Sequence, residues 1–205
     1  MSRAVKQATS AVDRHVAIHV RRLRSAARLS LDSLATKSGV SRSMISLIER
    51  GETSATAVVL ERLATGLRVP LARLFELPID RRAPARPVAR AKEQARWRDP
   101  ASGYRRRSIS PPGWPSPIRI VTVDFPPRAR VAYDTGVHEP PIHQQVWVLS
   151  GRIELTVGAE RFSLERGDCA AMALDRPITF ANRTLRRARY VVVTSSDSGS
   201  GAARR

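Results

Sequence analysis

The chain has 205 residues, enough for one large or two small domains, and 42% of them are hydrophobic, which suffices for a packed core. Its 36 Lys and Arg residues against 18 Asp and Glu residues give a net charge of +18, a balance typical of proteins that bind polyanions such as DNA. The single cysteine, Cys169, excludes an intrachain disulfide and a zinc site built on several thiolates.

The expected location is the cytoplasm, with no membrane partner. No apolar run approaches the roughly 20 residues that a bilayer span needs. The N-terminus also lacks the apolar block of a secretory signal. The basic residues are spread along the whole chain, so charge alone does not separate a DNA-binding protein from one with an arginine-rich composition.

Changes in composition predict an α + β protein with two domains. Residues 1–11 are polar and form a predicted flexible arm, and residues 12–77 have helical periodicity. Residues 78–100 are rich in Pro, Arg and Ala and are predicted to be a linker, in which residues 90–97 could form a short helix. Residues 101–194 contain β-branched and aromatic runs typical of an antiparallel β-barrel, and residues 195–205 form a predicted flexible tail.

Five short helices are predicted in the N-terminal domain. The first has an apolar stripe and an opposite, basic face; the stripe is Val16, Val20, Leu23 and Ala27, and the basic face is Arg14, Arg21, Arg22, Arg24 and Arg28. The second helix is predicted to begin after the N-cap Ser30 and to end at Gly39, and the third to begin after the N-cap Ser41 and to end at Gly51. The fourth begins after an N-cap at Thr53, Ser54 or Thr56. The fifth begins at Pro70 and covers residues 71–75.

This ordered set of residues resembles the Xre/Cro-repressor family of helix-turn-helix regulators. The match spans some 60 residues and rests on 23–24, 30–31, 34–35, 39–41, 45–46, 48–51, 63–64, 70–71 and 74–75. Two positions depart from the family pattern. Ser54-Ala55 stands where a proline is usual, which should loosen the loop, and Arg28 stands where a glycine is usual.

The third helix is the predicted reading head, because a helix fits the major groove and its N-terminal side chains reach base edges. The predicted base contacts are Arg42, Ser43 and Ser46. The predicted phosphate contacts are Ser33, Lys37, Ser41, Arg50, Thr53 and Ser54. In the competing interpretation Ser30 and Ser41 are helix caps only, and Arg50 pairs with Glu49 or Glu52.

The C-terminal half resembles a cupin domain. Residues 144–152 alternate with period two, and the resemblance rests on Gln144, on residues 148–152 and 164–168, and on residues 175–177 followed by Asn182. A helix-turn-helix joined to a cupin is a known class of bacterial regulator. The resemblance implies that the cupin senses a small ligand and forms a homodimer.

The resemblance also places metal ligands at four positions of the cupin. His138 matches, but the other three hold Pro140, Gln144 and Ile178, and His143 should face away from Gln144. We therefore expect no metal, no cofactor and no catalysis. The predicted ligand pocket comprises His138, Gln144, Met172, Ile178 and Phe180, and Trp147 on the outer face is a candidate dimer contact.

These features predict a sequence-specific transcriptional regulator, expected to be a repressor, that binds double-stranded DNA as a homodimer and responds to a small-molecule effector. Two alternatives stay open. One is a metal-dependent cupin enzyme fused to a DNA-binding domain. The other is a basic protein that binds DNA without regard to sequence.

Overall fold

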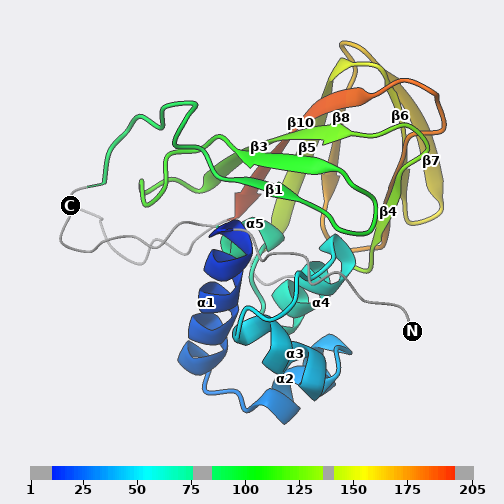
Figure 1. Cartoon of the computed structure of the whole chain (residues 1–205). Coiled ribbons are helices and arrows are strands. Elements are labelled where there is room, and N and C mark those ends of the chain that lie inside the picture. Colours follow the sequence, from blue (N-terminus) through cyan, green and yellow to red (C-terminus); the bar gives the residue numbers. More distant parts are fainter. Residues whose placement is uncertain (1–10, 76–84, 136–140, 197–205) are drawn as a thin grey trace, which may run out of the picture.

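Five helices precede an antiparallel β structure in the computed structural model, which describes residues 11–75, 85–135 and 141–196 (Figure 1). This order confirms the predicted α + β class with a helical N-terminal part. In the described residues the helices are α1 (Ala11–Ala26), α2 (Leu31–Ser38), α3 (Arg42–Glu49), α4 (Ala57–Gly66) and α5 (Leu71–Leu74). No helix in these ranges combines the length and apolarity needed to cross a bilayer.

Local hydrogen bonds set the helix boundaries, as the sequence predicts. Ser30 Oγ accepts a hydrogen bond from Ser33 N at 3.0 Å, and Ser41 Oγ accepts one from Met44 N at 3.3 Å. Of the three candidate caps for α4, Thr56 takes the role by accepting from Val59 N. Gly39 ends α2 with a left-handed φ of 65°.

The helices pack around a core that follows the predicted stripes, with one exception at the end of α1. The fully buried side chains here are Val20, Leu34, Ile45, Leu60, Leu63 and Leu74. Ala27, predicted to extend the apolar stripe, is exposed, so that prediction is wrong. The reason is that α1 ends at Ala26 and the chain turns at Arg28, which has a left-handed φ of 55°.

The left-handed backbone at Arg28 explains why glycine is usual at this position, because a side chain there costs roughly 1 kcal/mol. We expect Arg28→Gly to raise the free energy of unfolding by about 0.5–1 kcal/mol in urea denaturation, since glycine's greater freedom in the unfolded chain offsets part of the gain. Arg22→Gly is the control: Arg22 is exposed within α1, so glycine should lower stability by about 1 kcal/mol. A loss of stability in Arg28→Gly would contradict the explanation.

The described β strands form two antiparallel sheets rather than one closed barrel. The first sheet has the order β1 (Arg96–Arg98), β2 (Arg105–Ser108), β3 (Ile118–Phe125), β10 (Ala188–Ser196), β5 (Ile142–Ser150) and β8 (Cys169–Ala173). The second has the order β4 (Arg130–Tyr133), β9 (Ile178–Ala181), β6 (Arg152–Val157) and β7 (Glu160–Glu165). Their inner faces share a core that includes Phe125, Val146, Val148, Ile153 and Leu155, so the domain is a cupin-like sandwich.

The sheet extends beyond the predicted boundaries at both ends. Residues 96–98 form a strand inside the predicted linker, and the short helix considered for residues 90–97 is not formed. The strand forms because alternation buries Trp97 between two exposed arginines, and its backbone pairs with that of Arg106. At the other end β10 runs past residue 194, where Ser195 pairs with His143 and Ile118.

The helical part and the sheets share one continuous core. Trp97 stacks edge-on against Phe75, at 5.1 Å between ring centroids, and against Tyr104 at 5.7 Å. Its Nε1 donates a hydrogen bond to Asp13 Oδ1 at 3.2 Å. The buried Asp99 accepts a hydrogen bond from Ala57 N, the first residue of α4, at 2.9 Å. The segment from β1 to β2 therefore fixes the helices to the sandwich.

Candidate functional site: a DNA-reading helix and an interdomain cavity

The N-terminal half of α3 is open to solvent. Arg42 and Ser43 are exposed, while Ile45 and Ile48 face the core. Figure 1 shows α2 and α3 at the end of the helical part that is remote from the sheets, so the sandwich does not cover this surface. Arg42 Nε lies 3.3 Å from Asp32 Oδ1, and both side chains are largely exposed.

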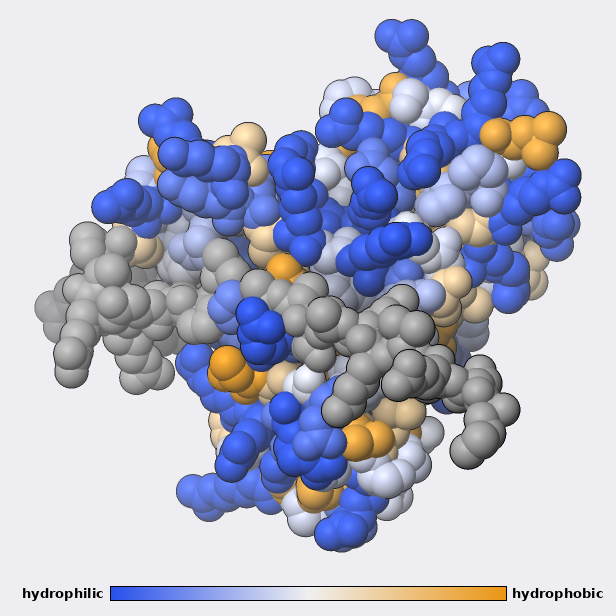
Figure 2. All heavy atoms as spheres, in the orientation of Figure 1, coloured by the Kyte–Doolittle hydropathy of each residue, from blue (hydrophilic) through white to orange (hydrophobic). Residues whose placement is uncertain are grey.

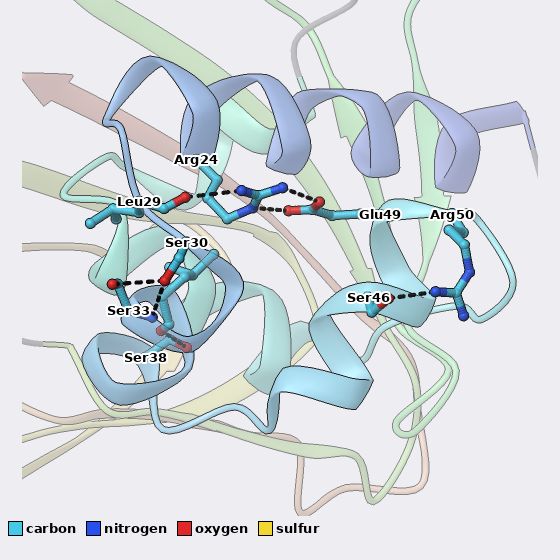
Figure 3. Close-up of polar contacts among 9 residues, drawn as sticks. Arg24, Leu29, Ser30, Ser33, Ser38, Ser46, Glu49 and Arg50 are labelled. Atoms are coloured by element: carbon cyan, nitrogen blue, oxygen red, sulfur yellow. Dashed lines mark hydrogen bonds and ion pairs between the residues drawn. The ribbon is translucent and has the colours of Figure 1, made fainter.

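Ser46 and Arg50 contact each other on the outer side of α3 (Figure 3). Arg50 Nη1 donates a hydrogen bond to Ser46 Oγ, and the guanidinium also donates two hydrogen bonds to the Glu52 carboxylate at 2.7 and 3.1 Å. The alternative in which Arg50 pairs with Glu52 is thus what the structure has. These contacts leave the Ser46 hydroxyl proton and two N–H groups of Arg50 unused.

Arg24 does not lie on the exposed basic face where the sequence placed it. Its Nε and Nη2 donate to the two carboxylate oxygens of Glu49, each at 2.7 Å, and its Nη1 donates to Leu29 O (Figure 3). The side chains are 16% and 7% exposed, so this bidentate pair links α1 to the end of α3 from within the domain. The helical period gives the side on which Arg24 starts, but not the reach of its long side chain.

The predicted phosphate contacts fall into two groups. Ser33, Lys37 and Ser41 are exposed around the start of α3, whereas Thr53 and Ser54 are half-buried. Ser54 Oγ donates to Asp13 Oδ2 at 3.0 Å, and the neighbouring Ala55 is buried. A hydrogen bond to α1 and the burial of Ala55 therefore hold this loop in the absence of the usual proline.

A cavity of about 90 Å³, here called the interdomain cavity, lies inside the sandwich where α4 and α5 meet it. Three predicted pocket residues, Gln144, Ile178 and Phe180, line it. Met172 is not part of the lining, but its Sδ lies 3.9 Å from Nε2 of Gln144, which is. His138 lies outside the described residues. The helical part supplies the remaining wall: Glu61, Pro70, Leu71 and Ala72.

The cavity also contains ionisable groups that were not among the predicted site residues. Arg106 from β2 is 6% exposed, its Nε is buried without a hydrogen-bond partner, and its guanidinium lies 4.0 Å from the centroid of the Phe75 ring. Glu61 from α4 is 5% exposed; burial raises its pKa to about 7, against the opposing effect of Arg106. The Tyr104 and Tyr133 hydroxyls are 3.1 Å apart beside them.

A weak signal for Arg106 exists in the sequence. The run of residues 105–107 is entirely arginine, and a strand must turn its middle residue to the side opposite the other two. Glu61 carries no such signal, because its place on α4 faces the sandwich only after the two parts have docked. The interdomain cavity therefore combines predicted sheet residues with charged groups that only the tertiary structure brings together.

The two metal-ligand positions that the structure describes hold Gln144 and Ile178, which are not suitable metal ligands. Ile178 lines the interdomain cavity, Gln144 contacts Met172, and His143 is exposed on the opposite face of β5, as predicted. In the described ranges no group of three or more His, Cys, Asp or Glu side chains is placed to hold a metal ion. His138 and Pro140 lie outside those ranges.

Hydrophilic side chains are not confined to one part of the visible surface. Figure 2 shows hydrophilic side chains over both the helical part and the sandwich on the face in view. This agrees with the even spread of arginine along the chain. The exposed start of α3, rather than net charge, therefore marks the candidate DNA-binding surface.

Comparison with known proteins supports both halves of this architecture. Residues 15–77 match the HTH_31 family, described as a helix-turn-helix domain. The HTH-type transcriptional regulator SutR of Escherichia coli (strain K12) is 38% identical over 65 residues, which are 32% of this chain and 36% of SutR. The match thus spans about a third of that relative's length.

Two solved structures resemble the chain at the level of fold. An HTH_3 family transcriptional regulator from Vibrio cholerae superposes with a TM-score of 0.71 at 22% identity, covering 90% of this chain and 97% of that one. The Cupin_2 domain of an XRE family transcriptional regulator from Enterobacter cloacae matches at a TM-score of 0.41 and 18% identity, over 45% of this chain and 96% of that one. Residues 15–77 therefore match a helix-turn-helix domain, and over 90% of its length the chain has the same fold as the regulator from Vibrio cholerae.

Proposed function

We propose that the protein is a cytoplasmic, sequence-specific DNA-binding repressor, and not an enzyme. Residues 12–77 are the DNA-binding domain, and residues 101–194 sense a small molecule and form a homodimer. The observation that carries the proposal is the solvent-open N-terminal half of α3 within a helix-turn-helix domain, with Arg42 and Ser43 exposed at its start.

In this proposal α3 lies in the major groove, where Arg42, Ser43 and Ser46 contact base edges. The Arg42 guanidinium can donate two hydrogen bonds to guanine O6 and N7. Its present partner Asp32 does not prevent this, because exposed ion pairs typically contribute about 1 kcal/mol or less. The phosphate contacts are Ser33, Lys37, Ser41, Arg50, Thr53 and Ser54.

We expect Arg42→Ala to weaken binding to the preferred site by about 1–3 kcal/mol and to relax preference at one base pair. Band-shift assays on a selected site and its single-base variants measure this. Lys37→Ala is the matched control, because a lost phosphate contact should weaken all sequences alike and reduce the salt dependence. An unchanged preference profile in Arg42→Ala would refute this role of α3. Equal binding of all sequences by the unmodified protein would indicate a sequence-blind basic protein.

The homodimer is proposed to form through the outer face of the six-stranded sheet. Trp147 on β5 is 49% exposed there, and in the adjacent strands it pairs with Val191 and Cys169. A two-fold dimer would present two copies of α3 to two half-sites. A ligand in the pocket of His138, Gln144, Met172, Ile178 and Phe180 would change DNA binding only through different affinities for two arrangements of the dimer.

A further inference from the structure

We propose that the interdomain cavity binds a small carboxylate, whose anionic group is held by Arg106 and lies opposite Glu61 of the DNA-binding domain. The inference rests on the proposed function in one respect, that the cavity is the effector site. It adds the chemical class of the effector and the contact through which the helical part senses it.

Arg106 is the group in the cavity that lacks a counter-ion. Its side chain is buried and its Nε has no hydrogen-bond partner. Among the described residues no carboxylate lies within ion-pair distance of its guanidinium. The Cζ atom of Arg106 instead lies over the Phe75 ring, 4.0 Å from the ring centroid. A buried guanidinium is stable when a planar anion takes two of its hydrogen bonds, and a carboxylate has the matching geometry.

Glu61 is a candidate for this counter-ion, but it forms no ion pair with Arg106. It lines the same cavity and interacts electrostatically with Arg106, yet forms no ion pair with a described residue. Because burial raises its pKa to about 7, the carboxyl group is neutral in a large fraction of molecules at neutral pH. In that form it tolerates a second carboxylate and can donate a hydrogen bond to it.

The remainder of the cavity favours a short organic acid over an inorganic ion. Its lining includes polar groups besides Arg106 and Glu61, namely the hydroxyls of Tyr104 and Tyr133 and the amide of Gln144. Both sheets also contribute apolar side chains to the lining: Val121, Val123, Ile178, Phe180 and Val192. The cavity volume of about 90 Å³ holds roughly six waters, at about 15 Å³ for each. This volume limits the size of the apolar group that the organic acid can carry.

The position of Glu61 connects the ligand to the DNA-binding domain. Glu61 lies on α4, and Leu71 and Ala72 on α5 belong to the same wall, so a ligand touches both parts of the protein at once. A carboxylate that binds Arg106 also changes the environment of Glu61 and of Phe75 beneath Arg106. Its affinity must therefore depend on how the helices dock on the sandwich.

The test uses NMR titration of the full chain with sodium butanoate and sodium benzoate, each compared with its own amide at constant ionic strength. We expect each acid to bind at least tenfold more tightly than its amide. In Arg106→Met, which keeps an unbranched apolar stem but removes the guanidinium and its charge, the preference should fall below twofold. Arg105→Met is the matched control, because Arg105 is exposed on the other face of β2 and should keep the full preference.

Glu61→Gln provides a second test that leaves Arg106 in place if Arg106→Met does not fold. At pH 8, where Glu61 of the unmodified protein is mostly ionised, we expect this variant to bind the acids at least fivefold more tightly and the amides with unchanged affinity. Equal affinities for acid and amide, a retained preference in Arg106→Met, or no gain in Glu61→Gln would each overturn the inference. If the acids fail while band shifts still show sequence-specific DNA binding, the ligand class is wrong and the regulator stands.

Discussion

Replacing Trp97 with alanine is expected to lower the free energy of unfolding by about 3–5 kcal/mol, the range for large aromatic side chains removed from a core. Trp97 is 4% exposed and packs edge-on between Phe75 of the helical part and Tyr104 of the sandwich part. It also donates to Asp13 Oδ1. Its removal therefore opens a cavity where the two parts share their core and leaves a carboxylate oxygen without that donor.

Urea denaturation followed by circular dichroism measures this effect, with Trp114→Ala as the control. Trp114 is 39% exposed, so its replacement should cost less than about 1 kcal/mol. We also expect Trp97→Ala to separate unfolding of the helices from unfolding of the sheets, because Trp97 is a main link between them. A single transition of unchanged midpoint would show that the parts are held together elsewhere.

Trp97 also illustrates which features the sequence predicts. Helices α2 to α4 and their caps Ser30 and Ser41 follow from residues a few positions apart, and the hydrogen bonds that form them are equally local. Trp97 lies in a segment whose prolines and arginines favour a solvated linker. Its strand exists because partners 84 and 22 positions away, Asp13 and Phe75, provide a buried site for its ring.

In the candidate site, too, the residues set by local alternation were predictable and those that meet only through tertiary contacts were not. Alternation along β5 is sufficient to turn Gln144 inward and His143 outward, and the structure has both as predicted. Arg106 and Glu61 could not be predicted as a pair, because they come from a strand and a helix that meet only in the docked protein. Hydrophobic periodicity assigns charged residues to the surface by default, which also explains the wrong placement of Arg24.

The pH dependence of stability provides the second large expected effect, and it depends on Glu61. Its pKa is raised from 4.5 to about 7 in the folded protein, chiefly by burial, so folding favours the neutral carboxyl group. The cost of ionising it is absent below about pH 4.5, grows as the pH rises towards 7, and is complete above that value. A rise of the pKa by this amount corresponds to roughly 3 kcal/mol lost from the free energy of unfolding.

Glu61→Gln removes this ionisation while keeping the size of the side chain. We expect the variant to gain roughly 3 kcal/mol relative to the unmodified protein between pH 4.5 and pH 8, measured as the difference between their free energies of unfolding at each pH. Glu160→Gln is the control, because Glu160 is exposed on β7 and its replacement should leave the pH profile unchanged.

The other ionisable groups around Glu61 do not obscure this result. Burial raises the pKa of Tyr104, Tyr133 and Tyr190 above their ordinary value of 10, so these side chains stay neutral throughout the interval. Burial lowers the pKa of Arg106 below its ordinary value, and the measurement also shows whether the attraction of Arg106 or burial dominates at Glu61. If the difference between the two proteins is the same at pH 5 and pH 8, the attraction of Arg106 outweighs burial and Glu61 is ionised throughout. Glu61 would then be a full counter-ion, and an anionic ligand would have to displace it from Arg106 rather than bind beside it.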